Sequence, residues 1–135
     1  MKKCICIGTV AILVFFLSVL SVPAQGREPD FAIHRVVFAK GIENREPVGA
    51  AVVFAAGTPK VYCFIEALDI VKDTTLTVIW IHEGEEVHLT ELPLSAGPRW
   101  RTRAEKTIRG FNGSWQVEIR DGTGSLVSAA GFRVE

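Results

Sequence analysis

Cysteine is scarce in this chain, and its placement excludes a fold held by disulfides. Of the three cysteines in 135 residues, Cys4 and Cys6 lie in an N-terminal segment that we expect to be removed. Cys63 then stands alone and cannot close a disulfide within the chain. Alternation in "KVYCFIE" places it with Val61 and Ile65, so we interpret it as a buried small hydrophobic residue. Stability must therefore come from a hydrophobic core.

The chain also lacks an excess of basic residues. It carries fifteen Lys and Arg against fifteen Asp and Glu. Loss of Lys2 and Lys3 with the N-terminal segment leaves thirteen basic against fifteen acidic residues, a net charge of −2. A nucleic-acid-binding domain normally has a strongly basic balance. We therefore expect no nucleic-acid partner.

Catalytic motifs are missing as well. The sequence shows no nucleophile elbow and no paired carboxylates, and its "DGTGS" stretch lies between two predicted strands, where it cannot present a helix N-terminus to phosphate. We therefore predict that the protein is not an enzyme and uses no cofactor. The alternative is a small extracytoplasmic hydrolase or metal-dependent enzyme that draws its ligands from the three histidines and scattered carboxylates.

Two histidines flank the turn "EGEE", and the register of this hairpin decides whether they could share a metal ion. A two-residue loop at Glu83-Gly84 would set Trp80 opposite Val87 and point His82 and His88 to opposite faces. A three-residue loop would place both histidines on one face but would set the tryptophan opposite one of them. The first register pairs apolar with apolar residues, so we expect no metal site here.

The N-terminus has the pattern of a secretory signal. A basic start is followed by an apolar run from Cys4 to Leu20, and small residues at Val22 and Ala24 provide a cleavage site. The pattern predicts a signal peptide helix over residues 1–24, then a short leader over 25–30. An uncleaved anchor is the alternative, and only in that case would the chain contact the membrane, through this segment. Both interpretations place the domain outside the cytoplasm, periplasmic or secreted.

After the leader, short apolar runs alternate with turn signals and no helical period occurs. This pattern predicts one all-β domain over residues 31–135, an immunoglobulin-like antiparallel β-sandwich of seven to eight short strands. An open small barrel is the alternative. The candidate strands are 31–39, 50–54, 60–68, 74–81, 87–94, 99–106, 114–120 and 126–134.

The last two strands show the clearest alternation. Trp115, Val117 and Ile119 alternate with polar residues and predict one buried face. We expect the final strand to bury Leu126 and Phe132 on the same face, and the mid-chain tryptophan strand to pack against this hairpin.

The stretch "GPRWRTRAEK" carries the strongest concentration of charge. A strand would send Arg99, Arg101 and Arg103 to one face and Trp100 to the other. These arginines could pair with carboxylates across strands and protect a sheet edge, or they could bind an anion or a partner, with Trp100 as a flat apolar contact. The candidate binding residues are Arg45, Glu46, Glu66, Trp100, Arg101 and Lys106.

A family resemblance rests on "FAKGIENREPV", "KVYCFIEAL", "TLTVIWIHEGEEV", "PRWRTRAEK", "GSWQVEIRDGTGSLV" and "FRVE". These motifs, in this order, resemble a bacterial family of exported domains of unknown function, DUF2914, from about Phe31 to Glu135. The resemblance implies a short exported or membrane-attached domain without an established activity. The chain has Val78 where the family pattern has a histidine, and Ala104 and Glu105 where it has serines, which further disfavours catalysis.

These observations together predict a non-catalytic binding domain outside the cytoplasm. We expect it to contact an envelope protein or an anionic glycan or lipid head group through the candidate residues above. A structural envelope subunit that associates with itself is the remaining alternative.

Overall fold

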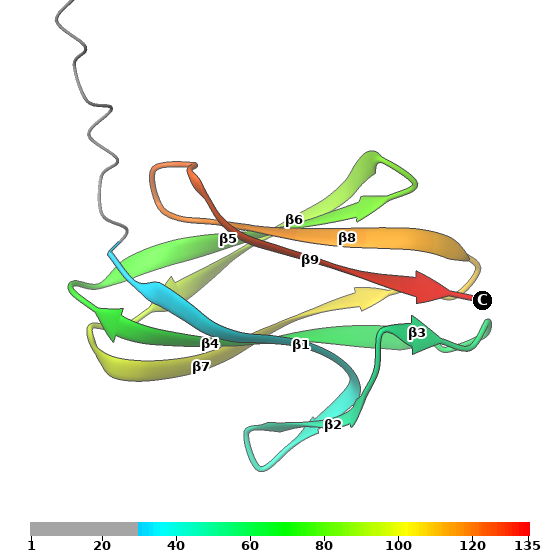
Figure 1. Ribbon diagram of the computed structural model, residues 1–135, viewed down its shortest axis with the longest axis horizontal. Coiled ribbons are helices and arrows are strands. Elements are labelled where there is room, and N and C mark those ends of the chain that lie inside the picture. The colour runs from blue at the N-terminus through cyan, green and yellow to red at the C-terminus, as the bar shows by residue number, and fades with distance from the viewer. Residues whose placement is uncertain (1–29) are drawn as a thin grey trace, which may run out of the picture.

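The computed structural model of this protein describes residues 30–135, and every regular element among them is a strand (Figure 1). The predicted all-β class is therefore confirmed. The predicted signal peptide and all of the leader except Asp30 lie outside the described residues. The strands are β1 (Ala32–Glu43), β2 (Glu46–Ala50), β3 (Val53–Phe54), β4 (Lys60–Ile70), β5 (Thr74–His82), β6 (Glu85–Leu94), β7 (Gly97–Thr107), β8 (Gly113–Arg120) and β9 (Leu126–Val134).

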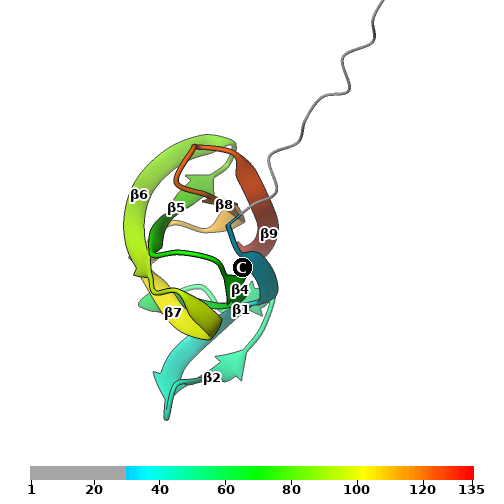
Figure 2. The ribbon, with the colours of Figure 1, turned by 90° about the vertical axis from the view of Figure 1, so that its left-hand side faces the viewer.

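The strands form two sheets that pack face to face (Figures 1 and 2). Sheet A has the order β2-β1-β4-β7, and sheet B has the order β3-β9-β8-β5-β6. All neighbours are antiparallel except β3 and β9, which run parallel. The predicted immunoglobulin-like sandwich is confirmed, with nine strands in place of seven to eight, and the separate sheets exclude the barrel.

One additional strand lies mostly in the connection between the predicted strands 31–39 and 50–54. β1 continues to Glu43 and β2 begins at Glu46, so Asn44 and Arg45 alone make the turn. Both residues have positive φ, 50° and 61°. A two-residue hairpin turn needs positive φ at both positions to match the twist of the strands that it joins. The strand predicted over 50–54 was wrong as one unit, because Ala50 ends β2 and only Val53–Phe54 form β3.

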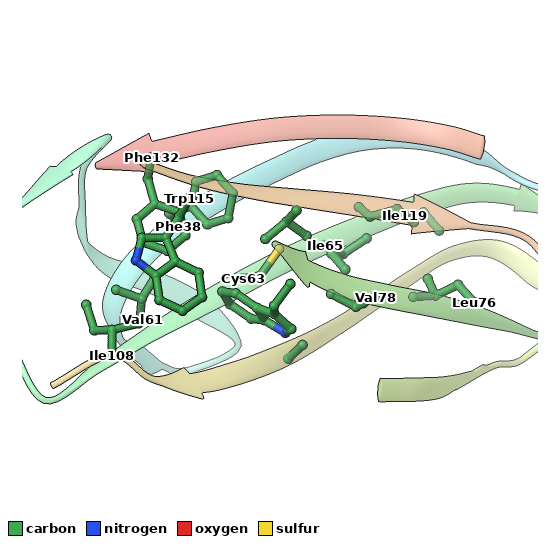
Figure 3. Packing of buried hydrophobic residues seen from close by; sticks show 14 of the residues in the cluster. Phe38, Val61, Cys63, Ile65, Leu76, Val78, Ile108, Trp115, Ile119 and Phe132 are labelled. Atoms are coloured by element: carbon green, nitrogen blue, oxygen red, sulfur yellow. The ribbon is translucent and has the colours of Figure 1, made fainter. Parts of the chain in front are cut away.

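The core lies between the two sheets and is built from alternating inward side chains (Figure 3). The ring of Trp115 stacks on Phe132 at 5.7 Å between centroids and meets Trp80 edge-on at 6.5 Å. Cys63 is fully buried in this core, as predicted. Burial raises the pKa of its thiol to about 12.

A β-bulge alters the predicted register of the β5–β6 hairpin. The two-residue Glu83-Gly84 loop is present, and His82 pairs with Glu85 as expected. A register shift between Trp80 and Ile81 then sets Trp80 opposite His88, so the predicted pairing of Trp80 with Val87 was wrong. The bulge inserts one unpaired residue into one strand, and this moves every later pair by one position.

A second bulge changes which side chain the last strand buries. The register shifts between Ile119 and Arg120, so that Arg120 pairs with Leu126 and Ile119 pairs with Ser128. Leu126 is 53% exposed, contrary to prediction, while its neighbour Val127 packs against the core. The prediction for Phe132 is confirmed, since it is buried.

Candidate functional site

Four charged side chains form a closed ring of ion pairs on the outer face of sheet A. Glu66 Oε2 accepts a hydrogen bond from Arg101 Nε at 2.9 Å and another from Arg35 Nη2 at 3.4 Å. Glu46 closes the ring, with 3.1 Å from Arg35 Nη2 to Oε2 and 3.1 Å from Arg101 Nη1 to Oε1. Positive and negative groups alternate around the ring, so its charges cancel.

Three neighbouring strands of sheet A place three members of this ring side by side. In β4 the residues Val61, Cys63 and Ile65 point into the core, so Glu66 points outward. The register sets Glu66 opposite Arg35 of β1 on one side and Arg101 of β7 on the other. Opposite charges directly across from one another stabilise adjacent strands.

Glu66 is the anchor of the ring because it is buried, with 4% of its side chain exposed. Burial alone would raise the pKa of this carboxyl, but the hydrogen bond from Arg101 and the charges of Arg99 and Arg35 outweigh it and lower the pKa. Glu66 therefore stays ionised at neutral pH. A buried charge needs this kind of compensation to be tolerated.

Glu46, the fourth member, reaches the ring from β2, in the β1–β2 hairpin. This hairpin lies on the side of sheet A that faces away from sheet B (Figures 1 and 2). Beside the ring, Phe64 of β4 also points outward, yet it is only 2% exposed. The guanidinium carbon of Arg35 lies 4.7 Å from the centre of the aromatic ring of Phe64. The ion-pair ring therefore packs against a buried aromatic side chain that lies outside the main core.

A groove of about 840 Å³ opens between the hairpin and the outer face of β4 and β7. Its lining residues are Ile42, Arg45, Phe64, Arg99, Trp100, Arg101, Thr102 and Arg103. Four of these eight residues are arginines, and no acidic residue lines the groove.

Three of the groove arginines add positive charge that the ring does not cancel. Arg99 Nε lies 3.9 Å from Glu66, a carboxylate that already serves two other arginines. Within residues 30–135, Arg45 and Arg103 have no carboxylate oxygen within 4.0 Å. The guanidinium of Arg103 lies 5.8 Å from the ring centre of Tyr62 instead. The groove therefore has a local positive surplus on a domain without one overall.

The structure brings together most of the residues that the sequence indicated. Glu46, Glu66 and Arg101 are ring members, and Arg45 lines the same groove. Trp100 also lines the groove and is 37% exposed, because β7 is the edge strand of its sheet.

Lys106 does not join this group. It pairs with Val61, a core residue, so it follows the inward phase of β7 and not that of Arg101. Its Nζ lies 5.9 Å from the ring centre of Phe111, away from the groove lining.

Arg35 and Phe64 belong to the site but were missed in the sequence. Neither lies in a charge-rich stretch, since Arg35 occurs in "AIHRVVFAK" and Phe64 in an apolar run. The signal available was Glu66 itself. A carboxylate in the apolar stretch "CFIEAL" is rarely buried without a charged partner, so a positive side chain on a neighbouring strand could be expected; the structure supplies Arg35 of β1 as one such partner.

The arginines of β7 differ in how they are paired. Arg101 takes part in internal ion pairing, and Glu105 pairs with Lys60 at 3.4 Å. Arg103, by contrast, has no carboxylate partner in the described part of the chain. The outer face of β7 thus carries Arg101 of the ion-pair ring and, at the groove, Arg103 without a carboxylate partner among residues 30–135.

His34 and His82 lie in separate surroundings. His34 Nε2 is 3.8 Å from Glu66, and His82 Nε2 is 2.7 Å from the carbonyl oxygen of Asn112. Among residues 30–135, no group of three His, Cys, Asp or Glu side chains is arranged to hold a metal ion. The same residues contain no helix of the length and apolar character needed to cross a membrane.

Solved structures share this fold. The C-terminal domain of wzt aligns over 79% of this chain and 74% of its own length, with a TM-score of 0.55 and 8% identity. A GH3 beta-glucosidase from Bifidobacterium adolescentis aligns with a TM-score of 0.46 and 16% identity, covering 77% of this chain and 17% of the enzyme. A beta-glucosidase from Kluyveromyces marxianus gives 0.46 and 9%, covering 78% of this chain and 14% of the enzyme. At 8% identity, the likeness to the wzt domain shows the fold alone.

Sequence comparison gives a family but no individual relative. No curated protein matches the chain. Residues 73–134, which run from β5 to β9, match the family described as "Protein of unknown function (DUF2914)". The resemblance drawn from the sequence is thereby confirmed over these residues, which include Trp100 and Arg101 of the groove and exclude the β1–β2 hairpin. Over residues 73–134, this chain is similar to the DUF2914 family.

Proposed function

We propose that the protein is a non-catalytic binding domain outside the cytoplasm, and that its groove holds an anionic group of a glycan or a lipid head group. The observation that carries this proposal is the surplus of positive charge in the groove. Arg45, Arg99 and Arg103 line a concave surface in which the nearby carboxylates are already paired with other arginines.

The chemistry of arginine favours oxyanions. Its planar fork binds carboxylate, sulfate and phosphate through two parallel hydrogen bonds and remains charged at every physiological pH. The ion-pair ring holds Arg101 in a fixed orientation beside the groove, so little conformational entropy is lost there on binding. The groove volume of about 840 Å³ lies within the usual range for small-ligand sites.

A binding role fits the electrostatics better than catalysis does. A general acid or base works best with a pKa near the operating pH. The pKa of Glu66, the buried carboxyl nearest the groove arginines, is lowered and not raised toward neutrality. The location outside the cytoplasm rests on the signal-like pattern of residues 1–24.

Arg103→Glu is the variant that tests this function. Arg103 has no carboxylate partner in residues 30–135, so reversing its charge disturbs the groove without breaking a pair. Arg101→Glu would instead bring a third carboxylate beside Glu66 and Glu46 and destabilise the fold. Arg133→Glu is the control for the change in net charge, because Arg133 is an exposed residue of β9 in sheet B; its exposed pair with Glu135, at 3.3 Å, is lost with it.

The probes are sulfated dextran and vesicles containing phosphatidylglycerol, which present the same anionic chemistry from a glycan and from a lipid. We expect wild type and Arg133→Glu to bind one of them similarly and Arg103→Glu to bind at least about fivefold more weakly. Equal loss in both variants would show nonspecific charge attraction and contradict the proposal. If neither probe binds and an envelope protein is retained in a pull-down, the anionic-ligand assignment is wrong.

A further inference from the structure

The carboxylate of Glu46 is bound in the way that an anionic ligand would be, by the guanidinium groups of two arginines. Arg35 Nη2 donates to both of its oxygens, at 3.3 and 3.1 Å, and Arg101 Nη1 lies 3.1 Å from Oε1. Two guanidinium groups therefore hold one carboxylate, next to a groove lined by three further arginines.

Glu46 differs from Glu66 in how firmly it is held. The side chain of Glu66 is 4% exposed and lies in β4, between two strands of the same sheet. The side chain of Glu46 is 44% exposed and lies in β2, an edge strand of sheet A. Within sheet A, β2 has backbone pairing with β1 alone. Removing Glu46 from the ring would therefore expose two arginines that Glu66 still holds in place.

We propose that Glu46 is an internal competitor for the ligand, and that a sulfate, phosphate or carboxylate group binds between Arg35 and Arg101 in its place. This inference rests on the proposed function and adds a defined anion position to it. Once Glu46 is displaced, the surplus positive charge increases by one, and the anion gains the two arginines of the ring. Glu46 then lowers the affinity of the groove for anions and sets how strongly the domain binds.

Three variants separate displacement from a general effect of charge. Glu46→Gln removes the competing charge at constant size. Glu46→Asp keeps the charge but shortens the side chain by one methylene, so that its carboxylate no longer spans both arginines. Glu105→Gln is the control, since Glu105 is on the same face of β7, about 13 Å from Arg101 along the strand, and pairs with exposed Lys60.

The experiment is a titration of each purified protein with sodium sulfate, followed by NMR at constant ionic strength. Breaking two partly exposed ion pairs predicts about fivefold to tenfold tighter sulfate binding by Glu46→Gln. Glu46→Asp should also bind more tightly than wild type, although its net charge is the same. Glu105→Gln should change less than about twofold, because salt screens charges at that distance.

Glu46→Asp decides the outcome. Affinity equal to that of wild type in Glu46→Asp, or equal gains in Glu46→Gln and Glu105→Gln, would overturn the competitor role while leaving the groove function intact. Absence of sulfate binding in all four proteins would overturn both. A thermal melt of each variant confirms that the fold is retained, since the exposed Glu46 contributes less to stability than the buried Glu66.

Discussion

Replacing Glu66 with glutamine tests whether the ion-pair ring organises sheet A. The substitution keeps the size of the side chain and one oxygen acceptor but removes the negative charge. Arg35 and Arg101 then lie 3.4 Å and 2.9 Å from a neutral group, and Arg99 loses its nearest carboxylate at 3.9 Å. Three guanidinium groups converge with only Glu46 to balance them.

The expected loss of stability follows from burial. Removing one partner of a fully buried ion pair costs about 3–5 kcal/mol, and losing a hydrogen bond to a charged group costs about 1.5–3 kcal/mol. Arg35 and Arg101 are 35% and 31% exposed, so water compensates part of the lost interaction. We therefore expect Glu66→Gln to lower the free energy of unfolding by about 2–3 kcal/mol.

Urea unfolding followed by tryptophan fluorescence measures this difference, because Trp80 and Trp115 are buried in the core. With an m-value of about 1–3 kcal/mol/M, the midpoint should fall by about 0.7–3 M. Glu105→Gln, which removes an exposed pair with Lys60, should change the free energy by less than about 0.5 kcal/mol. A midpoint for Glu66→Gln equal to that of this control would refute the reasoning about the ring.

Three further predictions concern titration and turn structure. Because the pKa of Glu66 is lowered in the folded protein, its ionised carboxylate contributes fully to stability above the ordinary pKa of 4.5, and this contribution is lost as pH falls through the lower pKa of the folded state. The urea midpoint should therefore fall more between pH 7 and pH 3 in wild type than in Glu66→Gln. Equal falls in the two proteins would contradict this. Asp121 accepts hydrogen bonds from the backbone N–H groups of Thr123 at 2.9 Å and Ser125 at 3.0 Å. Asp121→Ala should therefore lower the free energy of unfolding, measured in urea, by about 1–2 kcal/mol. An unchanged midpoint would show that these hydrogen bonds do not stabilise the protein. Burial raises the pKa of Cys63 to about 12, so a thiol reagent at pH 8 should modify it only as fast as the protein unfolds, and rapid labelling of the native protein would contradict its burial.

Local alternation made most strands predictable from the sequence. Runs such as Trp115-Val117-Ile119 place one apolar face against the core, and the structure buries all three. The bulges at Trp80/Ile81 and Ile119/Arg120 were not predictable, because they satisfy tertiary packing and leave no mark in the local pattern. They account for the errors in the β5–β6 register and in the burial of Leu126.

The candidate site was predictable where charge stood out and unpredictable where distant strands meet. The sequence indicated Glu46 as a charge near a turn, Glu66 as a charge within an apolar run, and Arg101 as part of an arginine-rich stretch. Arg35 comes to Glu66 through a pairing across 31 residues that also contains a bulge, so no local signal could assign it.

The position of Lys106, apart from the ring, has a simpler cause. It lies five positions after Arg101, and an odd spacing along a strand sends two side chains to opposite faces. The period of two alone excludes Lys106 from the outer face. The same rule places Trp100 on the inner side, and only its position on an edge strand lets it line the groove.

The most direct test of anion binding in the groove is NMR of the arginine side chains during titration with sulfate. We predict that the Nε–Hε signals of Arg99 and Arg103 shift in a saturable way with one shared affinity, while that of Arg133 in sheet B does not. Shifts of similar size at Arg133, or no saturable shift at Arg99 and Arg103, would contradict the assignment of this groove as an anion-binding site.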